Sequence, residues 1–175
     1  MAAGRVFWFT GLSGAGKTRV ATGTASLLRQ AGKTALILDG DELRATLGRD
    51  LGFSRDDVLE NNRRIARHCA DRRGDADAVL VPVISPLADG RALARAILSP
   101  GFYEVWISAD LDTVMARDPK GLYARARRGD IPDMIGYAPG NPYEPPQHPD
   151  LTIDTAAEPP ERCAARLFDF IVARL

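Results

Sequence analysis

Cysteine is scarce in this sequence, in which only Cys69 and Cys163 occur among 175 residues. The two form neither a Cys-x-x-Cys pair nor part of a metal-ligand grouping. From the residues before the first hydrophobic segment we expect no signal peptide. We therefore expect a protein of the reducing cytoplasm, in which both thiols are ordinary core or surface groups.

Net charge and long hydrophobic runs are also lacking. The 23 Lys and Arg residues balance the 23 Asp and Glu residues, so the charge favours neither a nucleic-acid partner nor a membrane surface. Apolar stretches such as residues 79–84 are far shorter than the roughly 20 residues that span a bilayer. The length fits one domain over residues 1–175, which predicts one functional site.

Short apolar segments alternate with helical patterns along the chain. The expected strands are residues 6–10, 34–38, 79–84, 102–107 and 151–154. Helices are expected over residues 17–30 and 160–175, with further helical segments between most of the strands. Near-continuous apolar strands separated by helices predict an α/β fold, with a doubly wound five-stranded parallel sheet of the P-loop kinase type.

The segment 120–149 has a different character. Arg125, Arg127 and Arg128 lead into a stretch that is rich in proline. This composition predicts a basic helix followed by an ordered but irregular loop, in the position where a kinase carries its lid.

A complete phosphate-binding motif follows the first expected strand. Its residues are Gly11, Leu12, Ser13, Gly14, Ala15, Gly16, Lys17 and Thr18. The glycines let backbone N–H groups surround the phosphates of ATP, Lys17 reaches the β and γ oxygens, and Thr18 can bind Mg²⁺. Because no Asn-Lys-x-Asp element for reading guanine occurs, a compact ATP-dependent kinase is favoured over a GTPase.

Two carboxylates, Asp39 and Asp41, end the second expected strand. The carboxyl edge of a parallel sheet is where ligands bind, so these side chains can hold Mg²⁺ through water and accept a proton from an attacking hydroxyl. The alternative is structural: Asp41 would cap a helix that begins at Glu42.

Taken together, the motifs of this chain resemble the adenylylsulfate kinase family over almost the whole sequence. They are residues 11–18, Asp39-Gly40-Asp41 with Arg44, Asp50-Leu51-Gly52-Phe53-Ser54, Glu60-Asn61 with Arg63-Arg64, Ile84-Ser85-Pro86, Arg117-Asp118-Pro119-Lys120-Gly121-Leu122-Tyr123, and Pro142-Tyr143-Glu144. The resemblance implies transfer of the ATP γ-phosphoryl group to the 3′-hydroxyl of adenylyl sulfate, with Mg²⁺, in a P-loop kinase that is usually a homodimer.

The resemblance also implies roles for individual residues. Asp41 is the expected general base, Lys17 and Asp39 are its catalytic partners, and Asp39 also contacts Mg²⁺ through water. The residues expected to bind the acceptor nucleotide are Arg44, Phe53, Asn61, Arg64, Ser85, Lys120 and Leu122. Ser85 matches a serine described as a phosphorylated intermediate, but because direct transfer needs none, we interpret it as an acceptor-site hydroxyl.

Three departures from the family pattern fall on the acceptor side. Val58 stands where the family has an arginine, Leu87-Ala88 replaces Tyr-Arg, and Met134 replaces a phenylalanine that stacks on the base, a role that Tyr137 could also fill. These leave two alternatives: a kinase for another nucleotide, such as a cytidine diphosphate derivative, and a regulatory subunit that binds ATP without transferring phosphate. His68 and His148 match no catalytic motif.

Overall fold

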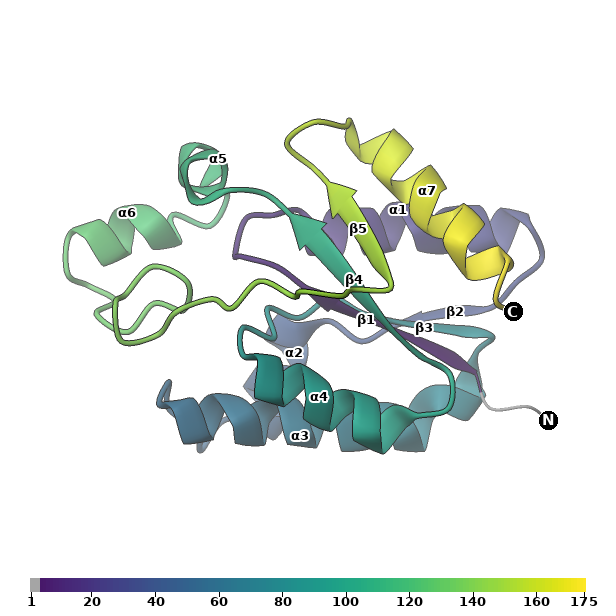
Figure 1. The fold of residues 1–175 in the computed structure, drawn as a ribbon, viewed down its shortest axis with the longest axis horizontal. Helices are drawn as coiled ribbons and strands as arrows, with labels where there is room; N and C mark the ends of the chain where they lie inside the picture. The colour runs from purple at the N-terminus through teal and green to yellow at the C-terminus, as the bar shows by residue number, and fades with distance from the viewer. Residues whose placement is uncertain (1–3) are drawn as a thin grey trace.

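A five-stranded, all-parallel sheet forms the centre of the structure, a computed structural model that describes residues 4–175 (Figure 1). Its strands are β1 (Arg5–Thr10), β2 (Ala35–Ile37), β3 (Ala78–Val81), β4 (Phe102–Ser108) and β5 (Leu151–Asp154). They lie in the order β2-β3-β1-β4-β5, with Val6 of β1 opposite Val79 of β3 and Phe102 of β4. The predicted fold class is confirmed.

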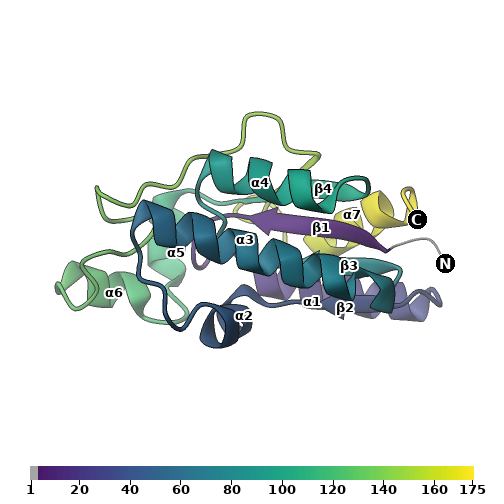
Figure 2. The same cartoon turned by 90° about the horizontal axis from the view of Figure 1, so that it is seen from below.

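Helices cover both faces of the sheet, as expected for parallel strands that are buried on both sides. They are α1 (Lys17–Gln30), α2 (Gly40–Leu47), α3 (Arg55–Arg72), α4 (Ala88–Leu98), α5 (Leu111–Arg117), α6 (Leu122–Arg127) and α7 (Pro160–Val172). Figures 1 and 2 show α1 and α7 on one side of the sheet, and α3 and α4 together on the other. No helix of residues 4–175 is both long and apolar enough to cross a bilayer.

Alternation along β1 divides its side chains between the two faces. Phe7 and Phe9 pack in the core beneath α1 and α7, together with Leu28 and Leu167. Val6 and Trp8 point the other way, into the core formed with α3 and α4. Each face of β1 is therefore packed in an apolar core, and a shift of register by one residue would exchange the side chains of the two cores.

The third expected strand is shorter in the structure than in the prediction. The ladder of β3 ends at Val81, whereas the apolar pattern extends to residue 84. Pro82 follows the strand, and since proline has no N–H to donate, it does not continue a ladder in the middle of a sheet. The chain instead turns at Ser85, whose φ is 43°, toward the carboxyl edge.

The segment after α5 has the backbone that its composition predicts. Short helix α6 is followed by an irregular chain up to β5. The far end of this loop is tied to the sheet, because the Tyr143 hydroxyl and Thr10 Oγ1 are 2.9 Å apart and the Glu144 N–H donates to the Pro86 carbonyl at 2.8 Å.

Candidate active site

A cavity of about 870 Å³ opens at the carboxyl edge of the sheet, where β1, β2 and β3 end side by side. The phosphate-binding loop forms one end of it. The other end is formed by α2, the first half of α3 and the lid segment. It is lined by Ser13, Gly14, Ala15, Gly16, Lys17, Thr18, Asp39, Asp41, Arg44, Phe53, Val58, Asn61, Ser85, Lys120, Leu122 and Met134, among others.

The phosphate-binding loop has the geometry that an anion requires. Gly14 and Gly16 adopt φ values of 80° and 92°, a conformation that favours glycine. The N-terminus of α1 carries no side-chain cap and no acidic residue in its first turn, so its N–H groups and partial positive charge face the cavity. The donor set therefore fits the triphosphate of ATP.

Lys17 is buried within this loop. Its Nζ donates to the carbonyl oxygens of Gly11 at 2.8 Å and Leu12 at 2.7 Å. Burial lowers the pKa of Lys17 to about 7, Asp41 and Asp39 oppose that shift, and Lys120 adds to it. The two carbonyls accept two of the three ammonium hydrogen bonds and supply no formal countercharge, which a phosphate would add. Gly11 and Leu12 themselves lie behind the cavity wall.

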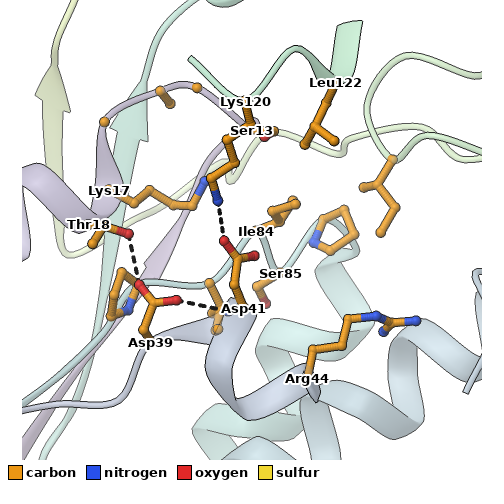
Figure 3. Close-up of a pocket in the computed structure, with 18 of the residues that line it drawn as sticks. Ser13, Lys17, Thr18, Asp39, Asp41, Arg44, Ile84, Ser85, Lys120 and Leu122 are labelled. Atoms are coloured by element: carbon orange, nitrogen blue, oxygen red, sulfur yellow. Dashed lines mark hydrogen bonds and ion pairs between the residues drawn. The ribbon is translucent and has the colours of Figure 1, made fainter. Parts of the chain in front are cut away.

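Thr18 and Asp39 meet at the position expected for Mg²⁺. Thr18 Oγ1 donates to Asp39 Oδ2 at 2.9 Å (Figure 3). No group of three or more His, Cys, Asp or Glu side chains within residues 4–175 forms a metal cluster. A hydroxyl beside a carboxylate nevertheless fits Mg²⁺, which takes few protein ligands and completes its shell with water and phosphate oxygens.

The residue that caps α2 is Asp39, and not Asp41 as in the structural alternative. Helix α2 begins at Gly40, and Asp39 Oδ1 accepts a hydrogen bond from the Asp41 N–H at 2.9 Å. One carboxylate oxygen of Asp39 therefore caps α2, and the other accepts the hydrogen bond from Thr18. The structural alternative for Asp41 is wrong, because its carboxylate lies one residue inside the helix and is free for other contacts.

The Asp41 carboxylate projects into the cavity and is paired with Lys120 (Figure 3). Its side chain is 71% exposed, and that of Lys120 is 55% exposed. The pair joins α2 to the start of the lid segment. It places a carboxylate between the phosphate-binding loop and the residues on the acceptor side of the cavity.

An aromatic platform lies at the other end of the cavity. Phe53 is 44% exposed, and the Arg44 guanidinium stacks on its ring at 4.4 Å from the centroid. Arg44 also donates to the carbonyls of Leu51 and Gly52 at 3.1 and 2.6 Å, which holds the 51–53 turn against α2. A partly exposed ring at the edge of a cavity is suited to stacking on a planar base.

Asn61 lies beside this platform with an unused acceptor. Its Oδ1 is buried and finds no hydrogen-bond donor among residues 4–175. Asn61 itself lines the cavity, but this oxygen lies close to Gly48 with almost no accessible surface, so it can meet a donor of the acceptor nucleotide only if the side chain rotates.

The Ser85 hydroxyl is held by two donors. Trp8 Nε1 and Asn62 Nδ2 each donate to Ser85 Oγ at 3.0 Å, and Ser85 is only 2% exposed. Its carbonyl accepts from Thr10 at 3.0 Å and Arg91 at 2.9 Å. A hydroxyl has two lone pairs and one proton, so the remaining capacity of Ser85 is to donate.

The three departures from the family pattern all have defined places. Val58 and Met134 are buried and line the cavity, whereas Leu87 is buried at the N-terminus of α4. Tyr137 packs edge-to-face on Tyr123 at 6.0 Å and is not among the lining residues. Of the two candidates for the second side of the base, Met134 is therefore the one that the fold places at the cavity.

Arg64 is the expected acceptor residue that does not line the cavity. Its guanidinium is bound by Asp50 at 2.6 Å and Glu60 at 2.8 Å, and it donates to the Leu47 carbonyl. Hydrogen bonds from Arg63 and Arg64 lower the pKa of Glu60 to about 2. Arg64 therefore joins α2, the following turn and α3. His68 and His148 also lie outside the lining residues.

Two lining residues on the phosphate side were not assigned a role from the sequence. Arg117 donates to the carbonyl of Thr155 at 2.6 Å, and Thr155 Oγ1 donates to the Ala15 carbonyl at 2.7 Å. Arg117 begins the Arg-Asp-Pro-Lys motif, which was a usable signal. Thr155 stands in no motif, and only the pairing of β5 with β4 brings it to the loop.

Known proteins resemble this chain along nearly its whole length. A family model of adenylylsulphate kinases matches residues 3–154. An adenylyl-sulfate kinase of Paraburkholderia xenovorans is 44% identical over 98% of this chain and 94% of its own. An adenylyl-sulfate kinase of Bacillus velezensis is 41% identical over 95% of this chain and 84% of its own.

A solved structure gives the same result in three dimensions. The APS kinase CysC of Mycobacterium tuberculosis, determined in complex with AMPPNP and APS, is 40% identical. The superposition covers 99% of this chain and 99% of the CysC chain, with a TM-score of 0.89.

Proposed function

The chain belongs to the adenylyl-sulfate kinase family, and we propose that Asp41 is the general base of its phosphoryl transfer. The activity is ATP-dependent phosphorylation of the 3′-hydroxyl of adenylyl sulfate, which yields ADP and PAPS in sulfate assimilation. The roles of individual residues below are inferred from the positions of their side chains.

The observation that carries the proposal is the position of Asp41. Its carboxylate lies between the phosphate-binding loop and the aromatic platform of Phe53, paired with Lys120. A substrate hydroxyl placed there can give its proton to Asp41 as its oxygen forms a bond to the γ-phosphorus. The bond from that phosphorus to the β-phosphate oxygen then breaks, and ADP leaves.

Lys17 and the N-terminus of α1 hold the donor phosphates during this transfer. The buried Nζ of Lys17 is withdrawn from solvent and lacks a formal countercharge among its direct hydrogen-bond partners, so an incoming phosphate satisfies it. Thr18 and Asp39 would hold Mg²⁺, directly and through water. The ion would neutralise charge on the β and γ oxygens when it is bound.

On the acceptor side, Phe53 and Met134 are suited to contact the base from its two faces. Arg44 backs the Phe53 ring, and Asn61, which lines the cavity, is suited to bind the nucleotide through its side-chain amide. Lys120 and Leu122 border the acceptor end of the cavity from the lid segment. Arg64 acts indirectly, because its ion pairs with Asp50 and Glu60 hold the turn that carries Phe53.

Ser85 is proposed to donate a hydrogen bond to the acceptor and not to carry the phosphoryl group. Both lone pairs of its Oγ are directed at Trp8 and Asn62, so the oxygen has none free to attack phosphorus. The covalent role is therefore disfavoured, and transfer goes directly to the substrate hydroxyl.

Residues 1–175 are proposed to act as one domain, since a single sheet carries both ends of the site. We also propose a homodimer of the cytoplasm. The free, buried cysteines fit a reducing compartment. The APS kinase of Thiobacillus denitrificans is hexameric, so a higher assembly is the alternative to the dimer. Light scattering on the purified chain measures the oligomeric state directly.

A steady-state assay tests the acceptor. The purified chain is incubated with Mg-ATP and adenylyl sulfate, ADP release is followed in a coupled assay, and the nucleotide product is identified chromatographically. We expect saturable formation of PAPS and far slower ADP release with a cytidine diphosphate derivative. The reverse preference, or ATP binding without ADP release on either nucleotide, would contradict the assignment.

A further inference from the structure

Tyr123 makes the direct hydrogen bond between the lid segment and the back of the phosphate-binding loop. Its hydroxyl donates to the Ser13 carbonyl at 2.9 Å. The side chain is 1% exposed, and its pKa is raised to about 12 by burial, so the phenol keeps its proton at every physiological pH. Ser13 and Gly14 line the cavity, whereas Tyr123 does not, so the contact is made from the side away from the ligand.

This contact orients the peptide between Ser13 and Gly14. A trans peptide is planar, and its C=O and N–H point in opposite directions. With the Ser13 oxygen directed back at Tyr123, the Gly14 N–H is directed into the cavity, where a phosphate oxygen would lie. Gly14 is also backed by α5 and the turn that follows it, since a Cβ on Gly14 would lie 3.4 Å from the Val114 carbonyl oxygen and 3.6 Å from Pro119 Cδ.

The same short stretch of chain reaches the acceptor side. Lys120 pairs with Asp41, and Leu122 lines the cavity. Lys120 lies three residues before Tyr123 and Leu122 one residue before it. The Asp118 carboxylate fixes this stretch, because it accepts from the N–H groups of Tyr123 at 3.2 Å and Ala124 at 2.9 Å. A movement of the phosphate-binding loop is therefore transmitted to the residues that close over the acceptor.

We propose that Tyr123 is a positioning residue that orients the Ser13–Gly14 peptide for the donor phosphates and couples ATP binding to the acceptor lid. The inference rests on the proposed placement of ATP at the phosphate-binding loop. The Tyr123 hydroxyl would then connect the ATP end of the cavity with the acceptor end. Coupling of this kind is reciprocal, so each nucleotide alters the affinity for the other by the same factor.

The test variant is Tyr123→Phe, which keeps the ring and its packing but removes the hydroxyl. Calorimetry measures the Kd of a non-hydrolysable Mg-ATP analogue, with and without adenylyl sulfate. We expect the Kd of the analogue to rise about three- to tenfold, the effect of one lost hydrogen bond. In the variant, adenylyl sulfate should no longer change the Kd of the analogue. In steady-state assays, the KM for ATP should rise by a larger factor than kcat falls.

Tyr137→Phe is the matched control. Tyr137 forms the edge-to-face pair with Tyr123, and its hydroxyl makes no hydrogen bond to residues 4–175. It should keep the wild-type Kd within twofold. An unchanged Kd in Tyr123→Phe, or an equal rise in both variants, overturns the inference. Failure of the wild-type protein to bind the analogue at all would instead overturn the placement of ATP.

A measurement on the wild-type protein covers the case in which Tyr123→Phe does not fold. Hydrogen–deuterium exchange is followed for the amides of residues 124–127, which lie in α6 and do not line the cavity. The ATP analogue alone should slow their exchange at least threefold. Exchange that responds only to adenylyl sulfate, or to neither nucleotide, contradicts the coupling.

Discussion

Thr18 and Asp39 are joined by a hydrogen bond of 2.9 Å, which links the first turn of α1 to the first residue before α2. The other oxygen of Asp39 caps α2 at the Asp41 N–H. One carboxylate thus sets the distance between the Thr18 hydroxyl, the proposed Mg²⁺ ligand, and the helix that carries the proposed base, Asp41. Capping needs only an oxygen that accepts a hydrogen bond, whereas binding of Mg²⁺ also needs the negative charge, so a substitution can remove the charge and keep the cap.

Asp39→Asn tests that separation. Asparagine caps a helix about as well as aspartate, so the free energy of unfolding should change by less than about 0.5 kcal/mol. The lost charge should raise the Mg²⁺ concentration needed for half-maximal activity by about tenfold. A metal titration of the steady-state rate, with Thr18→Ser as the conservative control, measures this. An unchanged metal requirement would remove Asp39 from the Mg²⁺ site.

Asp41→Asn should preserve ATP binding and lower kcat by at least about 100-fold, the effect of removing a general base. Glu42→Gln is the matched control, because it removes a carboxylate from the same first turn of α2 without touching the cavity lining. It should keep the wild-type kcat within twofold. Binding of the ATP analogue and the rate of a single turnover are measured in parallel, and full turnover in Asp41→Asn would exclude Asp41 as the base.

Phe53→Ala should weaken binding of the acceptor, adenylyl sulfate, and leave binding of the donor, ATP, unchanged. Base–aromatic stacking contributes about 1–3 kcal/mol per base, so the KM for adenylyl sulfate should rise by about tenfold or more. The KM for ATP should change by less than twofold. Leu111→Ala, which truncates another exposed large apolar side chain outside the cavity lining, is the control for non-specific effects. Equal rises in both KM values would show that Phe53 supports the fold and not the base.

ATP binding should be accompanied by proton uptake on Lys17. Its pKa of about 7 in the folded protein results chiefly from burial, and a bound phosphate would restore the charged form. Uptake should be small at pH 6, where Lys17 is already protonated, and should approach one proton at pH 8–9. Calorimetry in buffers with different ionisation enthalpies measures it, and no uptake at pH 8 would contradict the shift.

The same shift has a consequence for stability. A lysine whose pKa is lowered in the folded state binds fewer protons there than in the unfolded chain. Between pH 7 and the ordinary lysine pKa of 10.5, Lys17 therefore makes stability rise with pH. Below pH 7 both states are protonated, and its destabilising effect is constant.

Wild-type protein incubated with ATP alone should carry no phosphate on Ser85. Intact-mass and peptide-mass spectrometry detect such a species, and its accumulation at a rate that matches turnover would reinstate the covalent route. Ser85→Ala should lower both activity and stability, because it leaves the buried N–H donors of Trp8 and Asn62 unpaired at about 1–3 kcal/mol each. The exposed Ser26→Ala is the control.

Local chemistry explains why much of the site could be predicted. The phosphate-binding loop is continuous in sequence, and Asp39 and Asp41 are separated by a single glycine. What surrounds such segments was harder to predict. The third strand ends early because Pro82 follows it, the cap of α2 is Asp39, and the Arg64 guanidinium is bound by Asp50 and Glu60 outside the cavity lining.

The sequence by itself determined the order of strands and helices, the donor site and the pair of carboxylates beside it, since periodicity, glycine positions and strand ends depend on neighbouring residues. Only the tertiary structure decided which distant groups meet. Lys120 pairs with Asp41 across 79 positions, Trp8 fixes Ser85 across 77, and Tyr123 reaches Ser13 across 110. Parallel strands bring their carboxyl ends to one edge from remote parts of the chain, so these contacts depend on the packing of the whole sheet.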